Sequence, residues 1–298
     1  METRTLVTFL KAVELKNFYQ VAQVLGYAPS TITMQIKSLE EELGFPLFDR
    51  IGKKIALTSS GLAFLPYANK IVALNEEAHN LNSKEKEPQG NILCGSIESY
   101  MSNVLSFYLP IFVKSYPKIN ISIKLANTGP LLRMLKLGEL DLIFCLDNEI
   151  GDSDLYCVYR HAEPLIFAAS PKHKLAGRKK IPLKEVFAQR LILSEKSGRY
   201  RTLLDKMATD NDASICPLIA VDNVTAISNL VRKNLGITFL PEYSLRREIM
   251  RKRLVPLDVD ANLGSVLFQI YYNKNKWLSP ALSQFIQFIV NEEHKAFI

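Results

Sequence analysis

The side chains with the clearest chemical meaning lie between positions 29 and 37. Hydroxyl, thioether and ammonium groups recur there at helical spacing, and such groups contact base edges and phosphates in the major groove of DNA. The residues that we expect to contact DNA from this segment are Pro29, Ser30, Thr31, Thr33, Met34 and Lys37. The opposite face is apolar and steps by four, three and four residues through Ile32, Ile36, Leu39 and Leu43. The segment therefore predicts an amphipathic helix with an outer face suited to reading DNA.

A second, shorter helix is predicted just before it, because Val21, Ala22 and Leu25 share one face of residues 18–25. Gly26 follows at the point where this helix must end and the chain must enter a left-handed conformation. Ala22 and Ile32 are ten residues apart, a spacing that lets them meet where the two helices cross. This is the layout of a helix-turn-helix. An ordinary helical hairpin with a solvated outer face is the alternative.

The flanking segments complete this unit. Residues 4–16 predict a first helix with a packing role, and residues 51–58 alternate around a Gly-Lys-Lys tip, which predicts a two-stranded wing. We expect Arg50, Lys53 and Lys54 to contact phosphates, although a plain surface hairpin has the same pattern. The net charge of +7 does not support DNA binding by itself. Residues 1–89 carry ten basic and ten acidic side chains, so the excess lies in residues 90–298.

Residues 60–82 predict a long helix with an apolar seam that steps by three and four. The residues of this seam are Phe64, Tyr67, Ile71, Leu74, Ala78 and Leu81. Such a seam is typical of a coiled coil, so we expect a homodimer, or a homotetramer built from dimers, on an operator with an imperfect two-fold repeat. Packing of the seam on the chain's own C-terminal domain is the alternative. Residues 83–90 are polar and form the predicted hinge linker after the DNA-binding unit of residues 1–59.

Residues 91–298 change to strands that alternate with helices. Predicted strands at 92–97, 119–125 and 140–146, with helices between them, indicate a doubly wound parallel sheet. Further strands at 165–169, 191–194, 219–221 and 237–240 predict a second such unit. A last strand at 266–272 and a helix at 280–293 return to the first. We therefore expect lobe I to contain residues 91–162 and 265–298, lobe II to contain residues 163–264, and a cleft to lie between them.

In open α/β sheets, ligands bind beyond the carboxyl ends of the strands, where helices begin. The residues that we expect to bind an effector there are Ser99, Tyr100, Ser102, Thr128, Gly129, Leu146, Lys196, Ser197, Tyr200, Asp222 and Thr225. Helix capping explains any one of these hydroxyls equally well, and it is their convergence on one cleft that favours a binding site. Lys196, Arg199 and Arg201 favour an anionic metabolite.

Two sets of motifs carry a family resemblance. The run from Phe18 through residues 32–50, ITMQIKSLEEELGFPLFDR, closed by LTSSG at 57–61, resembles the N-terminal domain of LysR-type transcriptional regulators. One departure is Ala28-Pro29-Ser30, where the family usually has a polar cap and a Gln-Pro pair. Ala28 cannot cap the helix, which costs about 1 kcal/mol.

The second set lies in the C-terminal domain. The segments at 90–95, 116–117, 137–142, 164–165, 173–175 and 235–241 are similar to landmarks of the LysR effector-binding domain. The resemblance implies a winged helix-turn-helix with a long linker helix, followed by a two-lobed α/β effector domain like that of periplasmic binding proteins. It further implies a DNA-binding regulator controlled by a small molecule, with RNA polymerase as a further partner.

The sequence offers little to an enzyme, metal or membrane hypothesis. It has no GxSxG elbow, no GxxxxGK phosphate loop and no pair of histidines at metal-binding spacing, so we expect neither catalysis nor a cofactor. The four histidines are isolated and are predicted to lie on the surface. The four cysteines are scattered, so buried, reduced thiols are expected. No apolar run approaches the roughly 20 residues of a membrane helix, and we expect a cytoplasmic protein. A cytoplasmic solute-binding protein with an accessory helical domain is the alternative function.

Overall fold

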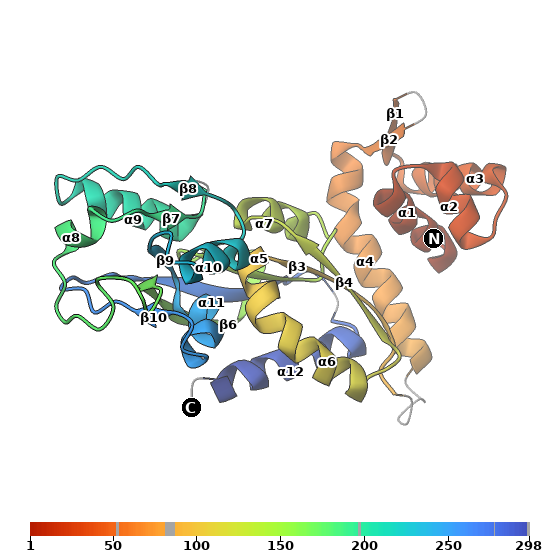
Figure 1. The fold of residues 1–298 in the computed structure, drawn as a ribbon. Helices are drawn as coiled ribbons and strands as arrows, with labels where there is room; N and C mark the ends of the chain where they lie inside the picture. The colour runs from red at the N-terminus through yellow and green to blue at the C-terminus, as the bar shows by residue number, and fades with distance from the viewer. Residues whose placement is uncertain (52–53, 81–86, 196–197, 277, 297–298) are drawn as a thin grey trace.

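The computed structural model describes residues 1–51, 54–80, 87–195, 198–276 and 278–296. The N-terminal unit contains three helices and a two-stranded antiparallel wing, which lie together at one end of the molecule (Figure 1). Their bounds are α1 Thr3–Leu15, α2 Phe18–Leu25, α3 Pro29–Leu43, β1 Phe48–Ile51 and β2 Lys54–Leu57. The predicted helix-turn-helix and wing are therefore confirmed.

Local signals set the ends of the two crossing helices. The Asn17 side chain accepts the amide N–H of Tyr19 at 2.9 Å and caps α2, which ends at Gly26 with φ of 70°. Helix α3 begins after Ala28 without a side-chain cap, and Pro29 occupies its first turn. Gly44, with φ of 78°, ends α3. A glycine adopts such a left-handed conformation without the strain that a Cβ atom would cause.

The core of this unit joins all its elements. Ala22 and Ile32 are both buried, so the crossing contact between α2 and α3 lies in the interior. Phe9 on α1 lies between Phe48 on β1 and Phe64 on the next helix, with ring centroids 5.5 and 5.4 Å away. Tilted aromatic pairs at this spacing add to the stability that burial provides.

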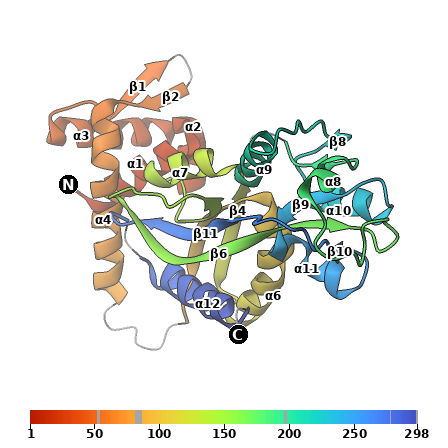
Figure 2. The same cartoon turned by 90° about the vertical axis from the view of Figure 1, so that its left-hand side faces the viewer.

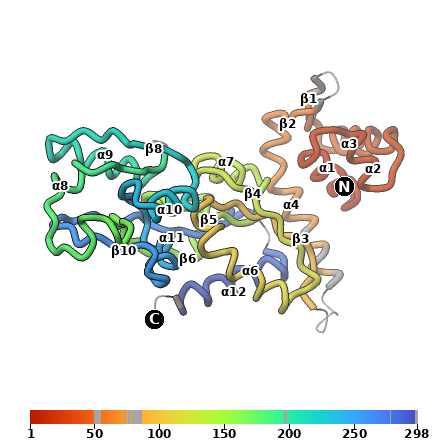
Figure 3. The backbone as a smooth tube through the Cα atoms, in the orientation of Figure 1, coloured from red at the N-terminus to blue at the C-terminus, as the bar shows by residue number. Residues whose placement is uncertain are grey.

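Helix α4, Ser59–Asn80, runs between the N-terminal unit and the rest of the protein (Figures 1 and 3). Thr58 Oγ1 accepts the amide N–H of Gly61 at 2.9 Å and caps its first turn. At Gly61 a Cβ atom would lie 2.2 Å from the Leu47 carbonyl oxygen, so only glycine permits this approach. The sequence Thr-Ser-Ser-Gly thus fixes where α4 begins and how it meets the wing.

The apolar seam predicted on α4 is divided in the structure. Phe64 lies in the core of the N-terminal unit and Ile71 packs against it, so part of the seam is used within the chain. Tyr67 and Leu74 are 63% and 60% exposed, and Ala78 is also exposed. Leu81 lies outside the described residues. A single seam reserved for a partner subunit is therefore wrong, and the apolar strip left over is Tyr67, Leu74 and Ala78.

The first lobe of the C-terminal domain contains three parallel strands, β3 Gly90–Ser96, β4 Ile119–Leu125 and β5 Leu142–Asp147, with β3 in the centre. A continuous helical stretch, α5 Glu98–Tyr100, η1 Met101–Leu105 and α6 Ser106–Ser115, follows β3, and α7 Thr128–Lys136 follows β4. Helices α6 and α12, Pro280–Ala296, cover one face of the sheet, and α7 covers the other (Figure 2). The predicted doubly wound unit is confirmed here.

Two long antiparallel strands, β6 Leu155–Ala169 and β11 Ser265–Asn273, run from the first lobe into the second (Figure 2). Residues 155–164 of β6 pair with β11, and the remainder pairs with β9 Thr238–Pro241 and β10 Val255–Pro256. Strands β7 Ile192–Leu193 and β8 Ile219–Ala220 form a separate parallel pair. The helices of this lobe are α8 Leu183–Phe187, α9 Arg199–Thr209, α10 Val224–Arg232 and α11 Glu242–Met250.

The second lobe therefore differs from the predicted second doubly wound unit. The strand expected at 165–169 is the end of β6 and pairs antiparallel with β9. The sequence pattern also missed α11 and the first ten residues of β6. Two connections between the lobes, which the sequence predicted, correspond to β6 and β11.

Candidate DNA-binding and effector sites

The outer face of α3 points to solvent. Pro29, Ser30, Met34 and Lys37 are exposed, and the side chain of Met34 is 66% exposed. Lys37 Nζ lies 3.6 Å from Glu41 Oε1, an exposed pair on one helix face that leaves the lysine accessible. Thus the residues predicted for the middle of the reading face are available to a partner.

Two of the predicted contacts are less exposed. Thr31 and Thr33 are only partly accessible, and Thr33 Oγ1 donates to the carbonyl of Pro29 at 3.2 Å. This bond is the usual way in which a threonine inside a helix satisfies its hydroxyl. The Thr33 methyl and hydroxyl thus lie at the edge of the face, and Met34 and Lys37 lie at its centre.

The wing is held beside α3 by a carboxylate. Glu40 Oε1 accepts the amide N–H groups of Leu47 and Phe48 at 2.6 and 3.2 Å, which fixes the start of β1 against the end of α3. Arg50 is in β1 and Lys54 is in β2, on either side of the wing tip. Lys53 lies outside the described residues.

A cavity of about 470 Å³ lies between the two lobes, in the size range of small-molecule sites. It is formed where β3, β4 and β5 end and where the helical stretches that begin with α5, α7, α9 and α10 start. Six of the residues predicted to bind an effector line it: Ser99, Thr128, Gly129, Leu146, Tyr200 and Asp222. Lys196 and Ser197 lie outside the described residues.

Three of the residues predicted for this site do not line the cavity. The Tyr100 side chain is only 2% exposed, stacks on Phe268 at 4.2 Å and donates its hydroxyl to Glu293 Oε1 at 2.6 Å. Ser102 Oγ donates to Glu98 Oε1 at 2.9 Å, and Thr225 lies on an exposed part of α10. The reason is helical geometry. Each step along a helix turns by about 100°, so the neighbours of a residue that faces the cavity face elsewhere.

Several polar residues that line the cavity were not among those predicted to bind the effector. These are Glu98, Asn127, Asp147, Ser194, Thr202 and Asn223, together with Arg199, which was predicted only to favour an anionic ligand. Most of them directly adjoin a residue that was predicted. The rule that ligands bind beyond strand ends predicted the correct loops. It did not predict which side chains of each loop point into the cavity.

Polar contacts connect the two lobes across the cavity. Glu98 Oε1 accepts from Asn223 Nδ2 at 3.1 Å, and Glu98 Oε2 accepts the Val224 amide N–H at 3.3 Å. Arg199 Nη2 donates to Asn148 Oδ1 at 2.5 Å. These contacts join α5 to the start of α10, and the end of β5 to the start of α9, so they hold the lobes close together.

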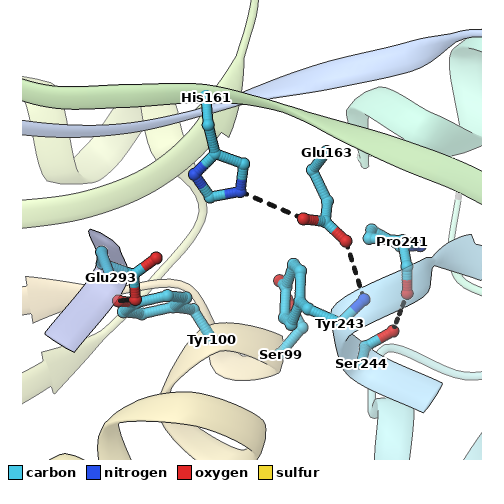
Figure 4. Close-up of polar contacts among 8 residues, drawn as sticks. All are labelled: Ser99, Tyr100, His161, Glu163, Pro241, Tyr243, Ser244 and Glu293. Atoms are coloured by element: carbon cyan, nitrogen blue, oxygen red, sulfur yellow. Dashed lines mark hydrogen bonds and ion pairs between the residues drawn. The ribbon is translucent and has the colours of Figure 1, made fainter. Parts of the chain in front are cut away.

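A buried polar cluster lies where the lobes are joined (Figure 4). Ser99 Oγ and Tyr243 Oη are 2.6 Å apart, and the Tyr243 amide donates to Glu163 Oε1 at 2.7 Å. The other oxygen of Glu163 lies 3.0 Å from His161 Nε2. Glu163 is 1% exposed, so this carboxylate is positioned entirely by its partners. The expectation that His161 is an isolated surface residue is therefore wrong.

The titration of buried groups agrees with these contacts. Burial raises the pKa of Tyr200 to about 12 and also raises the pKa of Tyr243 well above its usual value, so both phenols keep their protons at neutral pH. Burial likewise raises the pKa values of Cys94 and Cys145. Cys157 is half-buried and Cys216 is exposed, so the expectation of buried thiols holds for Cys94 and Cys145 alone.

In the described parts of the chain, no three His, Cys, Asp or Glu side chains gather as ligands for a metal ion. Nor does any helix of these parts have the length and apolar character needed to cross a membrane. The arrangement of the cavity is that of a binding site, with hydroxyl, amide and charged groups around a space open to a small molecule.

Comparison with known proteins gives this geometry its family. The model of the bacterial regulatory helix-turn-helix protein, lysR family, matches residues 3–62, and the model of the LysR substrate binding domain matches residues 85–293. The chain belongs to the LysR family. It is a transcriptional regulator with a helix-turn-helix DNA-binding domain and an effector-binding domain. Regulators of this family bind DNA and small molecules, form oligomers and are not enzymes.

Individual relatives cover nearly the whole chain. The uncharacterized HTH-type transcriptional regulator YwqM of Bacillus subtilis is 33% identical over 289 residues, which are 96% of this chain and 97% of that protein. The HTH-type transcriptional activator CmpR of Synechocystis is 28% identical over 92% of this chain and 90% of its own. A full-length OxyR variant from Pseudomonas aeruginosa has the same fold, with a TM-score of 0.76 at 17% identity over 98% of this chain and 94% of its own. These matches decide against the solute-binding alternative.

Proposed function

We propose that this LysR regulator reads an operator with an imperfect two-fold repeat through the outer face of α3, and that a small molecule between the lobes controls this binding. Met34 gives the proposal its main support, because a large apolar side chain at the centre of a polar helix face is 66% exposed. Such a side chain can pack on the methyl groups of thymine in the major groove, with Lys37 beside it for a phosphate or guanine.

Pairing of subunits is the second part of the proposal. The exposed strip of Tyr67, Leu74 and Ala78 on α4 suits contact with the same strip of a second copy, which would bring two α3 helices to neighbouring half-sites. Ile111 and Val113 on α6 are 50% and 46% exposed, and they support a second contact that would join dimers into a tetramer.

The effector is proposed to carry an anionic group. Helix N-termini attract anions, because their first N–H groups lack partners within the helix. Helices α7 and α9 both begin at the cavity, and Arg199 adds a cation at the start of α9.

Coupling between the sites is proposed to pass through α7. The first residues of α7, Thr128 and Gly129, line the cavity. At its other end, a Cβ atom on Gly138 would lie 3.4 Å from Asn69 Nδ2 on α4. Glu139 Oε1 lies 3.8 Å from Lys16 Nζ at the end of α1. A change in lobe closure would therefore move α7 against α4, change the spacing of the paired subunits and so change how the DNA is contacted or bent.

The same role implies a cytoplasmic protein that joins the nucleoid when it is bound to DNA. It also makes RNA polymerase a partner at the promoters that the protein controls. Both belong to the proposal and follow from the regulatory function rather than from any one contact.

Selection of DNA tests the proposal. The purified protein would be mixed with genomic fragments from its source at physiological salt with excess competitor, and the retained fragments sequenced. We expect a few intergenic fragments that share a two-fold repeat. Met34→Ala should lose this enrichment about tenfold, whereas Met250→Ala, which truncates a methionine on α11 that is 76% exposed, should keep it. Equal retention of all fragments, or full enrichment by Met34→Ala, would remove α3 as the reading element.

A further inference from the structure

We infer that the effector carries a positively charged group in addition to its anionic one, so that the cavity takes a zwitterionic small molecule. The inference rests on the proposed effector site and names the chemical class of its ligand. Three observations support it: the charged side chains that line the cavity, the hydrogen bonds that these side chains already form, and the ion pairs that they do not form.

Among the described residues that line the cavity, carboxylates outnumber cations. Glu98, Asp147 and Asp222 line it, and Arg199 is the only lysine or arginine among the described lining residues. No carboxylate of the three forms an ion pair with another described residue. A ligand with negative charge alone would add to the excess negative charge of these described residues and, on covering Asp147 and Asp222, would leave both without a counterion.

The chain itself already fills one anion site. Helix α10, Val224–Arg232, begins at the cavity, and Glu98 accepts hydrogen bonds from its first amide N–H and from the Asn223 side chain. The attraction of this helix N-terminus for an anion is thus satisfied from the opposite lobe. What remains for the anionic group of an effector is Arg199 with the start of α7.

Arg199 is suited to that role. Its Nη2 donates to the neutral Asn148 Oδ1, and its Nε is buried without a hydrogen-bond partner among the described residues. A guanidinium group in this state has donors left for a carboxylate. Asp147 adjoins Asn148, and its Oδ1 accepts the Asn148 amide N–H at 2.7 Å. Opposite charges therefore lie on either side of Asn148 without pairing to each other.

A place for the cationic group exists on the second lobe, where Asp222 lines the same cavity as Arg199. Asp222 lies next to the start of α10, and its charge acts on the Tyr200 phenol, as does that of Glu98. An ammonium group there would meet the Asp222 carboxylate in a cavity that Tyr200 also lines, and a carboxylate beside an aromatic side chain stabilises such groups in binding sites. A simple acid would leave Asp222 unpaired, and a simple amine would leave Arg199 unpaired. A zwitterion satisfies both.

The test compares matched ligands on the full-length protein. Thermal unfolding would be followed with each α-amino acid, with the 2-hydroxy acid of the same side chain and with the corresponding amine, at one pH and ionic strength. We expect an amino acid to raise Tm while its acid and amine counterparts do not, since only ligands that bind the folded state raise it. Calorimetry would then give the Kd of that amino acid.

Variants assign the binding to the cavity. Asp222→Asn should weaken the amino acid about tenfold or more, as loss of a hydrogen bond to a charged group does. Asp210→Asn, which removes one carboxylate from the exposed end of α9, should leave Kd unchanged. Gly129→Phe should abolish binding, because a Cβ atom at Gly129 meets no atom within 4 Å and the ring would occupy the cavity.

Several results would overturn the inference. They are a hydroxy acid or amine that raises Tm as much as the amino acid, an unchanged Kd in Asp222→Asn, or a Tm that none of the amino acids, hydroxy acids and amines raises. A hydroxy acid that binds wild type but not Gly129→Phe would leave the cavity as the effector site and reject only the zwitterion. Equal binding of the amino acid to wild type and Gly129→Phe would reject the cavity itself.

Discussion

The hydrogen bond between Ser99 and Tyr243 is a direct link between the lobes, and its removal is a sharp test of how they are joined. Ser99 follows β3 in the first lobe and Tyr243 lies on α11 in the second, with their hydroxyl oxygens 2.6 Å apart. The side chains are 5% and 8% exposed. Ser99→Ala and Tyr243→Phe each delete one hydroxyl and leave the rest of the side chain in place.

The expected magnitudes follow from burial. A hydrogen bond of this kind contributes about 1 kcal/mol net, and a buried hydroxyl that loses its partner costs about 1–3 kcal/mol. Each single substitution should therefore lower the free energy of unfolding by about 1–3 kcal/mol. The double variant leaves no orphaned hydroxyl, so its loss should be smaller than the sum of the single losses by about 1 kcal/mol.

Urea unfolding followed by circular dichroism would measure all four proteins. Tyr243→Phe combined with Ser115→Ala serves as the control, because Ser115 donates to a carbonyl of its own helix on an exposed surface. That pair should be additive within about 0.3–0.5 kcal/mol. If Ser99→Ala and Tyr243→Phe are additive to the same degree, the two hydroxyls do not act as a pair and the reasoning fails.

Three further outcomes are expected. Lys37→Gln should reduce the slope of log K against log salt for the selected operator by about 1.8, because a dimer would lose two phosphate contacts. An anisotropy titration measures this slope, and an unchanged slope would show that Lys37 contacts no phosphate. Gly61→Ala should destabilise the N-terminal unit by about 1–3 kcal/mol in thermal unfolding because of its backbone clash, whereas Gly129→Ala, in open space, should not. Burial raises the pKa of Glu293 above its ordinary 4.5. The folded state therefore binds this proton more tightly, and the contribution of Glu293 to the free energy of unfolding falls as pH rises from 4.5 through the folded pKa. Glu293→Gln should gain stability relative to wild type over that window in urea unfolding; a constant difference would contradict this.

The N-terminal unit could be predicted almost residue by residue because its signals are local. Gly26 and Gly44 end helices at positions where the backbone is left-handed. Pro29 begins one, and the Thr58 and Gly61 pair begins another. Each of these residues acts on its immediate neighbours in sequence, so periodicity and turn chemistry are sufficient.

The second lobe was harder because its signals are not local. Residues 155–164 form a strand only through pairing with β11, more than a hundred residues later, and their alternation is weak. Helix α11 is short and rich in charge, so it lacks a strong apolar stripe. The direction of side chains around the cavity was hard to predict for the same reason. Ser99 and Tyr100 are neighbours in sequence, yet one faces the cavity and the other the core.

Helix α4 illustrates what apolar periodicity can and cannot specify. The pattern predicted a helix with a buried stripe, and the helix is present, but a stripe does not name its partner. Phe64 packs in the N-terminal core, Leu65 and Asn69 lie against Gly138 of the effector domain, and Tyr67 and Leu74 are left exposed. One helix thus contacts the N-terminal unit on one face and the effector domain on another, and its third face is exposed. Because these contacts lie on different faces of one helix, the proposed movement at the end of α7 would be passed through Gly138 to α4 and from there to the exposed strip and α3.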